Sequence, residues 1–267
     1  MAVSNILQRY GIKEVADVTF YDITETGDPG APVLVLDSLK VTSIEQTAES
    51  AEARGGKGNA KLIVWDFGKE ITVNIEDALF SPKSLSIMMA DGRVTEEKTD
   101  KTIMKSARVV ATDNVKPKVY LDGKEISSEE LSSSLKFYEA KEGNVGLTET
   151  STFVKGNVYI ATWKHPVAAK TVITIKPDSF PGTYYVTGDT MIRSERTGKD
   201  EYFQFVIPKA KMTAEQTISL EAEGDPTTFN MSLQVLRPEN GEMIRFIKYE
   251  FADEAGGGGD DGFVDLT

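Results

Sequence analysis

Few residues of this chain have the types and spacing that acid–base catalysis requires. His165 is the only histidine, and it lies in Trp-Lys-His-Pro at residues 163–166, which we expect to form a turn between strands. A general base must be held within reach of the proton that it removes, and no serine close in sequence has a nucleophile-elbow setting. We therefore expect His165 to be a surface residue and the chain not to be an enzyme.

Acidic residues occur as neighbours in sequence, for example in Glu76-Asp77, Glu96-Glu97, Glu129-Glu130 and Asp260-Asp261. Consecutive side chains of a strand point to opposite faces of the sheet. Such neighbours do not by themselves form the acid and base of a hydrolase.

Metal and phosphate sites are not indicated either. The chain has no cysteine, which excludes disulfides and thiolate ligands. Asp22, Asp28 and Asp37 lack the spacing of a calcium-binding EF-hand loop. Gly-Gly-Lys-Gly at residues 55–58 lacks the remaining residues of a phosphate-binding P-loop. We expect no metal and no cofactor.

The elements that would position any site are mainly β-strands. Residues 16–23 and 32–41 are apolar or alternating runs, parted by glycine and proline. Shorter strands are expected at residues 105–111, 119–126 and 136–140, with a hairpin turn at Asp122-Gly123. From residue 157 onward the expected strands are 157–163, 170–175, 183–195, 200–207, 216–223 and 228–236. Regularly spaced short strands predict a β-sandwich or barrel.

One helix is expected to flank these strands, at residues 82–91. Ser81 suits its N-cap, Pro82 its first turn, and Gly92 the position after its end. A shorter helix is expected at residues 4–10.

The most informative segment runs from residue 45 to residue 76. Residues 45–59 are expected to be a long glycine-rich loop with charged side chains: Glu45, Glu49, Glu52, Arg54 and Lys57. Residues 62–67 and 70–76 are expected to form a hairpin, in which Gly68-Lys69 suits a two-residue turn because Gly accepts a positive φ.

One face of this hairpin is a core face, with Val64 opposite Val73. The other face sets apolar residues of one strand against polar residues of its partner, and we take as its candidate residues Trp65, Phe67, Glu70, Thr72, Asn74 and Glu76. A sheet that offers apolar surface on both sides is completed by packing against copies of itself.

The net charge of −12 argues against binding nucleic acid through its phosphates. An acidic surface lets DNA slide past, although acidity is also a plain solubility feature. No apolar run is long enough to span a bilayer, so no membrane insertion is expected. The N-terminus lacks the pattern of a secretory signal, so we expect synthesis in the cytosol.

The C-terminal residues 252–267 differ in composition from the rest. Ala-Gly-Gly-Gly-Gly precedes a short acidic peptide whose apolar residues are Phe263, Val264 and Leu266. This tail is either a tether that carries a small apolar plug to a neighbouring molecule or a frayed terminus.

Residues 40–88 and 200–251, which hold the loop, hairpin, helix and a C-terminal strand pair, resemble tail tube (major tail) proteins of tailed bacteriophages. The resemblance implies a β-sandwich or barrel with a flanking helix. It also implies hexameric rings whose inner strands form a continuous barrel around a channel for DNA, within a virion assembled in the host cytoplasm.

By this resemblance, the hairpin 62–76 supplies inner-sheet strands and the loop 45–59 reaches an adjacent ring. The partners implied are further copies of the chain and the tape measure, baseplate, neck and, in some tails, sheath proteins. DNA passes through without specific binding. Residues 1–251 would form one tube-like domain, in which 112–150 has no counterpart and is a candidate insertion or decoration.

Two alternatives stay open. The chain could be a neck or baseplate component with the same fold. It could instead be a carbohydrate-binding or cell-surface β-sandwich that uses Trp65, Trp163 and Tyr184 as stacking platforms.

Overall fold

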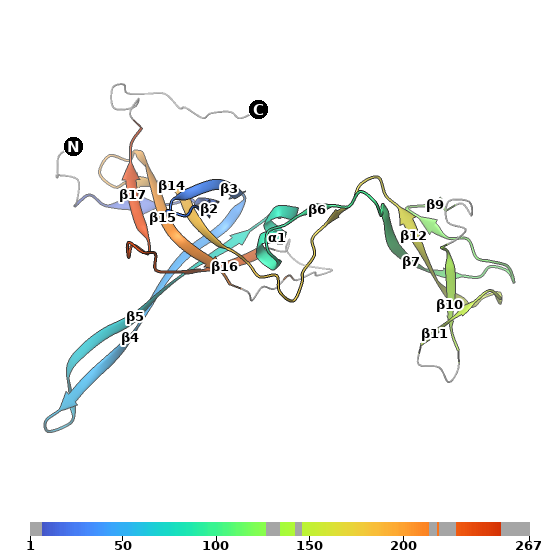
Figure 1. The fold of residues 1–267 in the computed structure, drawn as a ribbon, viewed down its shortest axis with the longest axis horizontal. Helices are drawn as coiled ribbons and strands as arrows, with labels where there is room; N and C mark the ends of the chain where they lie inside the picture. Colours follow the sequence, from blue (N-terminus) through green and yellow to red (C-terminus); the bar gives the residue numbers. More distant parts are fainter. Residues whose placement is uncertain (1–6, 127–133, 142–145, 214–217, 219–227, 252–267) are drawn as a thin grey trace. The chain divides into compact units, whose positions relative to one another are not determined.

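The computed structural model describes residues 7–126, 134–141, 146–213, 218 and 228–251. The described chain is mainly β with one α-helix, which confirms the predicted fold class. It divides into two compact units (Figure 1). Unit 1 comprises Met1–Val94 and Ile173–Thr267, and unit 2 comprises Thr95–Val172.

Unit 1 is built on a nine-stranded antiparallel sheet in the order β3-β2-β14-β15-β16-β5-β4, in which β1 also pairs with β14 and β17 with β15. The strands are β1 (Tyr10–Ile12), β2 (Asp17–Ile23), β3 (Pro29–Leu36), β4 (Leu39–Gly55), β5 (Ala60–Asp77), β14 (Thr183–Ser194), β15 (Asp200–Met212), β16 (Phe229–Val235) and β17 (Arg245–Tyr249). Their alternating side chains place one face of the sheet in a common core.

Residues from the N-terminal and C-terminal segments of the chain pack together in the core of unit 1. Val73 of β5 lies opposite Leu233 of β16, and both are fully buried. Phe20 of β2 contacts Tyr184 of β14 edge to face, with ring centroids 5.8 Å apart. On β15, Phe205 lies opposite Gly188 of β14.

The helix α1 (Pro82–Met89) closes part of this core with Ile87 and Met88. Ser81 is its N-cap, as predicted: its hydroxyl accepts a hydrogen bond from the Ser84 amide at 3.0 Å, and the Ser84 hydroxyl accepts one from the Ser81 amide at 2.8 Å. These reciprocal bonds satisfy two amides that the helix leaves unpaired. The helix ends two residues before the predicted boundary.

The predicted helix at residues 4–10 is wrong where the structure describes it. Tyr10 begins β1 and lies opposite Ser194 of β14. Strand pairing with an existing sheet satisfies these backbone groups better than a helix of two turns, which is marginal on its own. Residues 4–6 lie outside the described part of the chain.

Unit 2 has its own sheet and its own core. A four-stranded sheet runs in the order β11-β10-β12-β7, beside a β8-β9 hairpin. The strands are β7 (Thr102–Val110), β8 (Tyr120–Leu121), β9 (Lys124–Glu125), β10 (Lys136–Ala140), β11 (Leu147–Thr150) and β12 (Val158–Pro166). Asp122 and Gly123 have φ of 50° and 79°, which confirms the predicted turn. The stretch 112–150 lies inside this unit.

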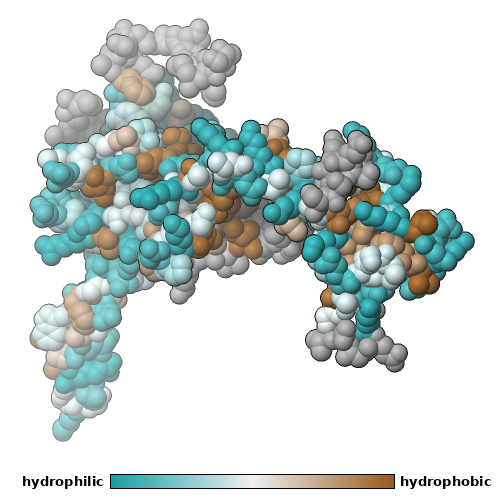
Figure 2. Space-filling model, turned by 45° about the vertical axis from the view of Figure 1, so that its right-hand side comes forward, coloured by the Kyte–Doolittle hydropathy of each residue, from teal (hydrophilic) through white to brown (hydrophobic). Residues whose placement is uncertain are grey.

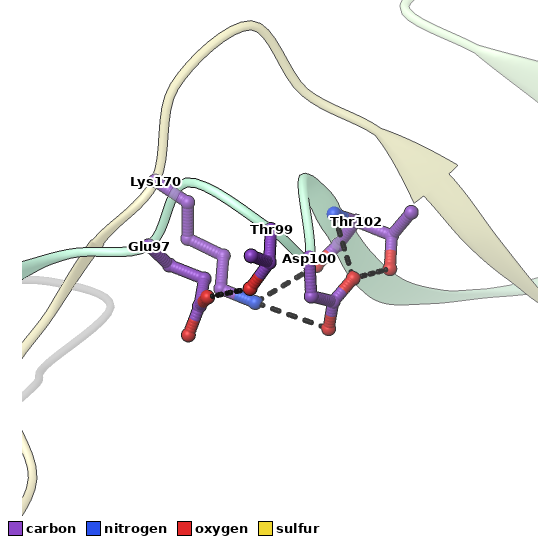
Figure 3. A network of polar contacts seen from close by, with 5 residues as sticks. All are labelled: Glu97, Thr99, Asp100, Thr102 and Lys170. Atoms are coloured by element: carbon purple, nitrogen blue, oxygen red, sulfur yellow. Dashed lines mark hydrogen bonds and ion pairs between the residues drawn. The ribbon is translucent and has the colours of Figure 1, made fainter.

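The two chain segments that begin and end unit 2 are tied together. β6 (Thr95–Glu96) pairs with β13 (Thr171–Val172). Beside this pair, Lys170 Nζ lies 3.4 Å from an Asp100 carboxylate oxygen and donates to the Thr102 carbonyl at 3.3 Å (Figure 3). The hydroxyl of Thr102 and, less strongly, Lys170 hold the pKa of Asp100 below its usual range.

His165 does not lie in a turn, so that prediction is wrong. It is part of β12, opposite Ile103 of β7, because the ladder between these strands continues to Pro166. Its Nδ1 is buried without a hydrogen-bond partner among the described residues. Trp163, two residues earlier, belongs to the buried core of unit 2 and offers no exposed stacking platform.

Candidate assembly site on the β4–β5 arm

Strands β4 and β5 pair along nearly their whole length and project beyond the rest of unit 1 (Figure 1). We call residues 47–70 the arm. The predicted loop 45–59 is therefore wrong in its conformation: residues 45–55 belong to β4, and only residues 56–59 form the turn. The turn carries the positive φ angles, 78° at Gly56, 87° at Gly58 and 51° at Asn59. The glycines thus mark a hairpin tip.

The physical reason for the error is the composition of β4. Its arm half consists mostly of Ala, Ser and Glu, which have little intrinsic strand preference. These residues form a strand because β5 beside them offers a full row of backbone hydrogen-bonding groups. Cross-strand pairing overrides the weak local preference.

The predicted turn at Gly68-Lys69 is also wrong, because both residues lie inside the single strand β5. Thr47 lies opposite Glu70 and Glu49 opposite Phe67, so Ala48 alone faces Gly68 and Lys69. This is a β-bulge, and Gly68 has a φ of 61°. The sequence correctly indicates a positive φ at Gly68, but a bulge uses it in place of a turn.

The bulge decides which side chains share a face. Glu70 and Phe67 are an odd number of residues apart and would point to opposite sides of a regular strand. Because the bulge adds one residue, both stand opposite β4 residues, Thr47 and Glu49, that share one side. We call the side of the sheet that carries Thr47 and Glu49 the outer side, because it faces away from the core of unit 1. The predicted face residues on this side are Trp65, Phe67, Glu70, Thr72, Asn74 and Glu76.

Between the bulge and the tip turn, the outer side of the arm is mainly apolar. Ile63, Trp65 and Phe67 are exposed by 51%, 54% and 51%. Opposite them on β4 lie Ala53, Ala51 and Glu49. The small alanines leave the large side chains uncovered, and apolar surface appears among hydrophilic atoms along the arm (Figure 2). The arm therefore carries an unfinished apolar surface.

On the other side of the bulge, at residues 70–76 of β5, the outer side is polar. Thr72 and Asn74 lie between β4 and β16, and the Ser232 hydroxyl of β16 donates to Asn74 Oδ1 at 2.8 Å. Glu70 and Glu76 flank them on β5. Ile71, Val73 and Ile75 alternate with these residues and are buried in the core. One strand thus presents carboxylates and amides on one side and core residues on the other.

The charged residues of the predicted loop are divided between the two sides. Glu45 and Glu49 lie on the outer side of β4. Glu52 lies on the opposite side, where it forms ion pairs with Lys61 and, at 2.7 Å, with Arg54. Lys57 lies in the tip turn. The exposed pairs contribute little to stability.

Sequence reasoning missed the contribution of β4 to this surface. Ala51 and Ala53 alternate with charged or polar residues, and that alternation was the available signal. Phe263, Val264 and Leu266, the predicted tether residues, lie outside the described residues. Within the described part, no cluster of three or more His or acidic residues is arranged to hold a metal, and no helix is both long and apolar enough to cross a membrane.

The comparison with protein families decides what kind of protein carries this arm. The family model described as the YomU/Tube protein family matches residues 10–248. The chain belongs to the YomU/Tube protein family. No curated protein matches the chain. Membership confirms the resemblance to phage tail tube proteins and identifies this YomU/Tube protein as a phage tube-related structural protein, a virion component. The match spans the whole arm and all of unit 2.

Proposed function

We propose that this YomU/Tube protein polymerises into stacked rings, hexameric as in the tail tubes that it resembles, and that the stack is the channel through which DNA leaves the virion. The observation that carries the proposal is the arm. It exposes Ile63, Trp65 and Phe67 on one side of a two-stranded ribbon. An isolated two-stranded ribbon is marginal in water, so a surface of another copy is its natural completion.

The energetic gain is sizeable when it is repeated around a ring. Full burial of a large apolar side chain contributes roughly 1.5–3 kcal/mol. Three side chains that are already half-buried would each gain about half of that on contact with a neighbour. A closed ring of heterologous contacts repeats the gain at every interface.

Among the described strands, none pairs with the second edge of β4, and this supports the same proposal. β3 and β4 are the two ends of the main strand path of unit 1. β3 carries Pro29 and Pro32, and proline cannot donate a ladder hydrogen bond. β4 has no proline over 17 residues. An exposed long edge of this kind is a template for pairing, and a neighbouring subunit would cover it.

The polar part of the outer side, which faces away from the core of its own subunit, suits the wall of a DNA channel. Glu45, Glu70 and Glu76 lie there on paired strands. Carboxylates repel phosphates, so DNA would pass without sticking. Lys211 of β15 lies beside Gln234 of β16 and borders this region, so the lining is acidic on β4 and β5 and becomes mixed toward β15.

In a tail, such a tube would contact the tape measure, baseplate, neck and, in a contractile tail, sheath proteins. A neck or baseplate role is the second candidate, and it predicts rings that do not stack.

Negative-stain microscopy and sizing chromatography of the purified chain test the proposal. We expect rings and tubes, with tube length increasing with protein concentration. A chain that stays monomeric at high concentration, alone and with its tail partners, would contradict the proposal. Single rings that never stack would favour the neck or baseplate role.

A further inference from the structure

Unit 2 contains a groove that is formed by residues outside the β4–β5 arm. Its volume is about 650 Å³, within the range of ligand sites. The residues that line it and matter here are Lys116, Leu135, Lys136, Phe137, Ser151 and Phe153. They come from the loop before β8, the start of β10 and the segment after β11.

The floor of the groove is aromatic. Phe137 is buried and contacts Phe153 edge to face, with ring centroids 5.1 Å apart. Phe153 in turn contacts Tyr159 of β12 at 5.2 Å. This packed cluster is rigid, and the partly buried Phe153 presents the aromatic surface that an apolar side chain can cover.

The rim of the groove is cationic. Lys116 Nζ lies 5.7 Å from the centre of the Phe137 ring. Within the part of the chain that the structure describes, no ion pair joins Lys116 to a carboxylate, whereas Lys136 pairs with Glu149 at 3.0 Å. An aromatic floor beneath an unpaired ammonium group suits an apolar side chain with a carboxylate close to it.

The groove also lies at a sheet edge. β11 is the outer strand of the four-stranded sheet, and Glu149 and Thr150 at its end line the groove. An extended peptide could therefore pair with β11 while its side chains enter the groove, which is the usual geometry of strand addition.

The C-terminal sequence of this chain matches these requirements. Asp261, Phe263 and Asp265 alternate along Asp-Gly-Phe-Val-Asp-Leu, so in an extended strand all three point to the same side. An aromatic side chain would then be flanked by two carboxylates about 7 Å away on either side. The glycines at residues 256–259 precede the segment and give a linker of flexible composition.

We propose that the groove of unit 2 binds residues 260–266 of another copy of this chain, with Phe263 against Phe153 at the exposed edge of the aromatic cluster and a flanking aspartate paired with Lys116. The contact would link subunits independently of the β4–β5 arm. It goes beyond tube formation and does not require it, so the two proposals can fail separately.

The test uses a fluorescent peptide of residues 256–267 and the chain ending at Phe251, followed by anisotropy. We expect saturable binding that weakens as salt is raised. Lys116→Glu should weaken it by about tenfold or more, since a charge-assisted contact is replaced by repulsion. The matched control is Lys98→Glu, an exposed lysine elsewhere in unit 2 that should leave binding unchanged. A peptide with Asp261 and Asp265 changed to lysine should recover binding to the Lys116→Glu chain.

The peptide with Phe263→Ala should also bind at least about tenfold more weakly, because the aromatic floor loses its contact. Dilute full-length chain should bind the peptide as well as the truncated chain does. If the dilute full-length chain does not bind the peptide while the truncated chain does, the chain's own tail occupies the groove. That result would overturn the assignment to another copy. Absence of saturable binding, equal binding to the Lys116→Glu chain, or selective binding of a glycan that displaces no peptide would overturn the proposal. Sizing of the same samples reports tube formation independently.

Discussion

Trp65 lies directly opposite Ala51 across the β4–β5 ladder. A methyl group cannot cover an indole, so more than half of the Trp65 side chain remains exposed although it stands in a regular strand. Ile63 and Ala53 repeat the arrangement one pair nearer the tip. The large side chains of β5 therefore stand higher than the alanines of β4 beside them. A neighbouring subunit can pack into the space above the alanines.

The bulge at Gly68 should control assembly through side-chain direction. Gly68→Val places a β-branched residue at a φ of 61°, which costs roughly 1–2 kcal/mol and disfavours the bulge. Without the bulge the register slips by one residue and turns Trp65 and Phe67 to the other side. We expect the variant to remain folded by circular dichroism and to lose rings and tubes in electron micrographs.

Deletion of Gly68 provides the control for this prediction. It removes the extra residue itself, so Phe67 can stay opposite Glu49 in a regular ladder. The deletion should therefore assemble better than Gly68→Val. Equal assembly of the two variants would show that the bulge does not set the face.

Gly188 should be intolerant of any side chain. A Cβ at this position would lie 2.1 Å from Cε1 of Phe205, whose ring is buried in the core of unit 1. Gly188→Ala should lower the free energy of unfolding by about 1–3 kcal/mol, because the ring must leave its place. Urea denaturation measures the change. Gly11→Ala is the control, since no heavy atom lies within 4 Å of its Cβ position, and an equal loss there would contradict the account.

Two aspartates should change stability with pH in opposite directions. Partial desolvation and the carboxylates of Asp37, Asp189 and Glu14 raise the pKa of Asp17 above its ordinary 3.8. The folded state then holds a proton that the unfolded state has lost, so this group's contribution to stability falls as pH rises from about 4 through the folded pKa. Asp17→Asn should be more stable than the wild type at pH 7, and the difference should vanish below pH 4.

Asp200 is the counterpart with the opposite sign. The Arg193 guanidinium donates to both of its carboxylate oxygens at 2.6 Å and lowers the pKa of Asp200. Its contribution is present above the ordinary aspartate pKa and is lost as pH falls through the folded value. Asp200→Asn should be the less stable protein at pH 7, by a small amount because the pair is exposed. Thermal melts from pH 3 to pH 7 check both variants, and the same sign for both would contradict the assignment.

The acidic part of the outer side should keep DNA mobile. Glu70→Lys reverses one charge on the proposed channel wall, repeated in every subunit. Tubes of this variant should retain short duplex DNA at low salt and release it as salt rises. Glu25→Lys changes the net charge equally at an exposed turn between β2 and β3 and should retain none. Equal retention by both would place Glu70 outside the channel.

Much of unit 1 is readable from sequence because its signals are local. The residues buried in β2 and β16 alternate, and Ser81 and Pro82 mark the start of α1. The arm is not readable in this way, because its pairing depends on β5 rather than on the composition of β4. Gly68 shows the same limit: a single positive φ fits both a turn and a bulge, and only the partner strand distinguishes them.

The boundaries between the two units could not be predicted from the sequence either. β6 and β13 are two residues each, and the pairing of Glu96 with Thr171 joins positions far apart in the sequence. β17 has no fully buried residue. Its place beside β15 follows from stacking of Tyr249 on Tyr202, a contact between distant segments.

The most direct test of the arm's role compares two neighbouring side chains on opposite sides of β5. Trp65 lies on the outer side and Val64, opposite Glu52, on the other, and both are about half exposed. Trp65→Ser and Val64→Ser should each stay folded, since neither side chain lies in the core. Electron microscopy and sedimentation should then show tubes for Val64→Ser and dispersed subunits for Trp65→Ser. Normal tubes from Trp65→Ser would contradict the account.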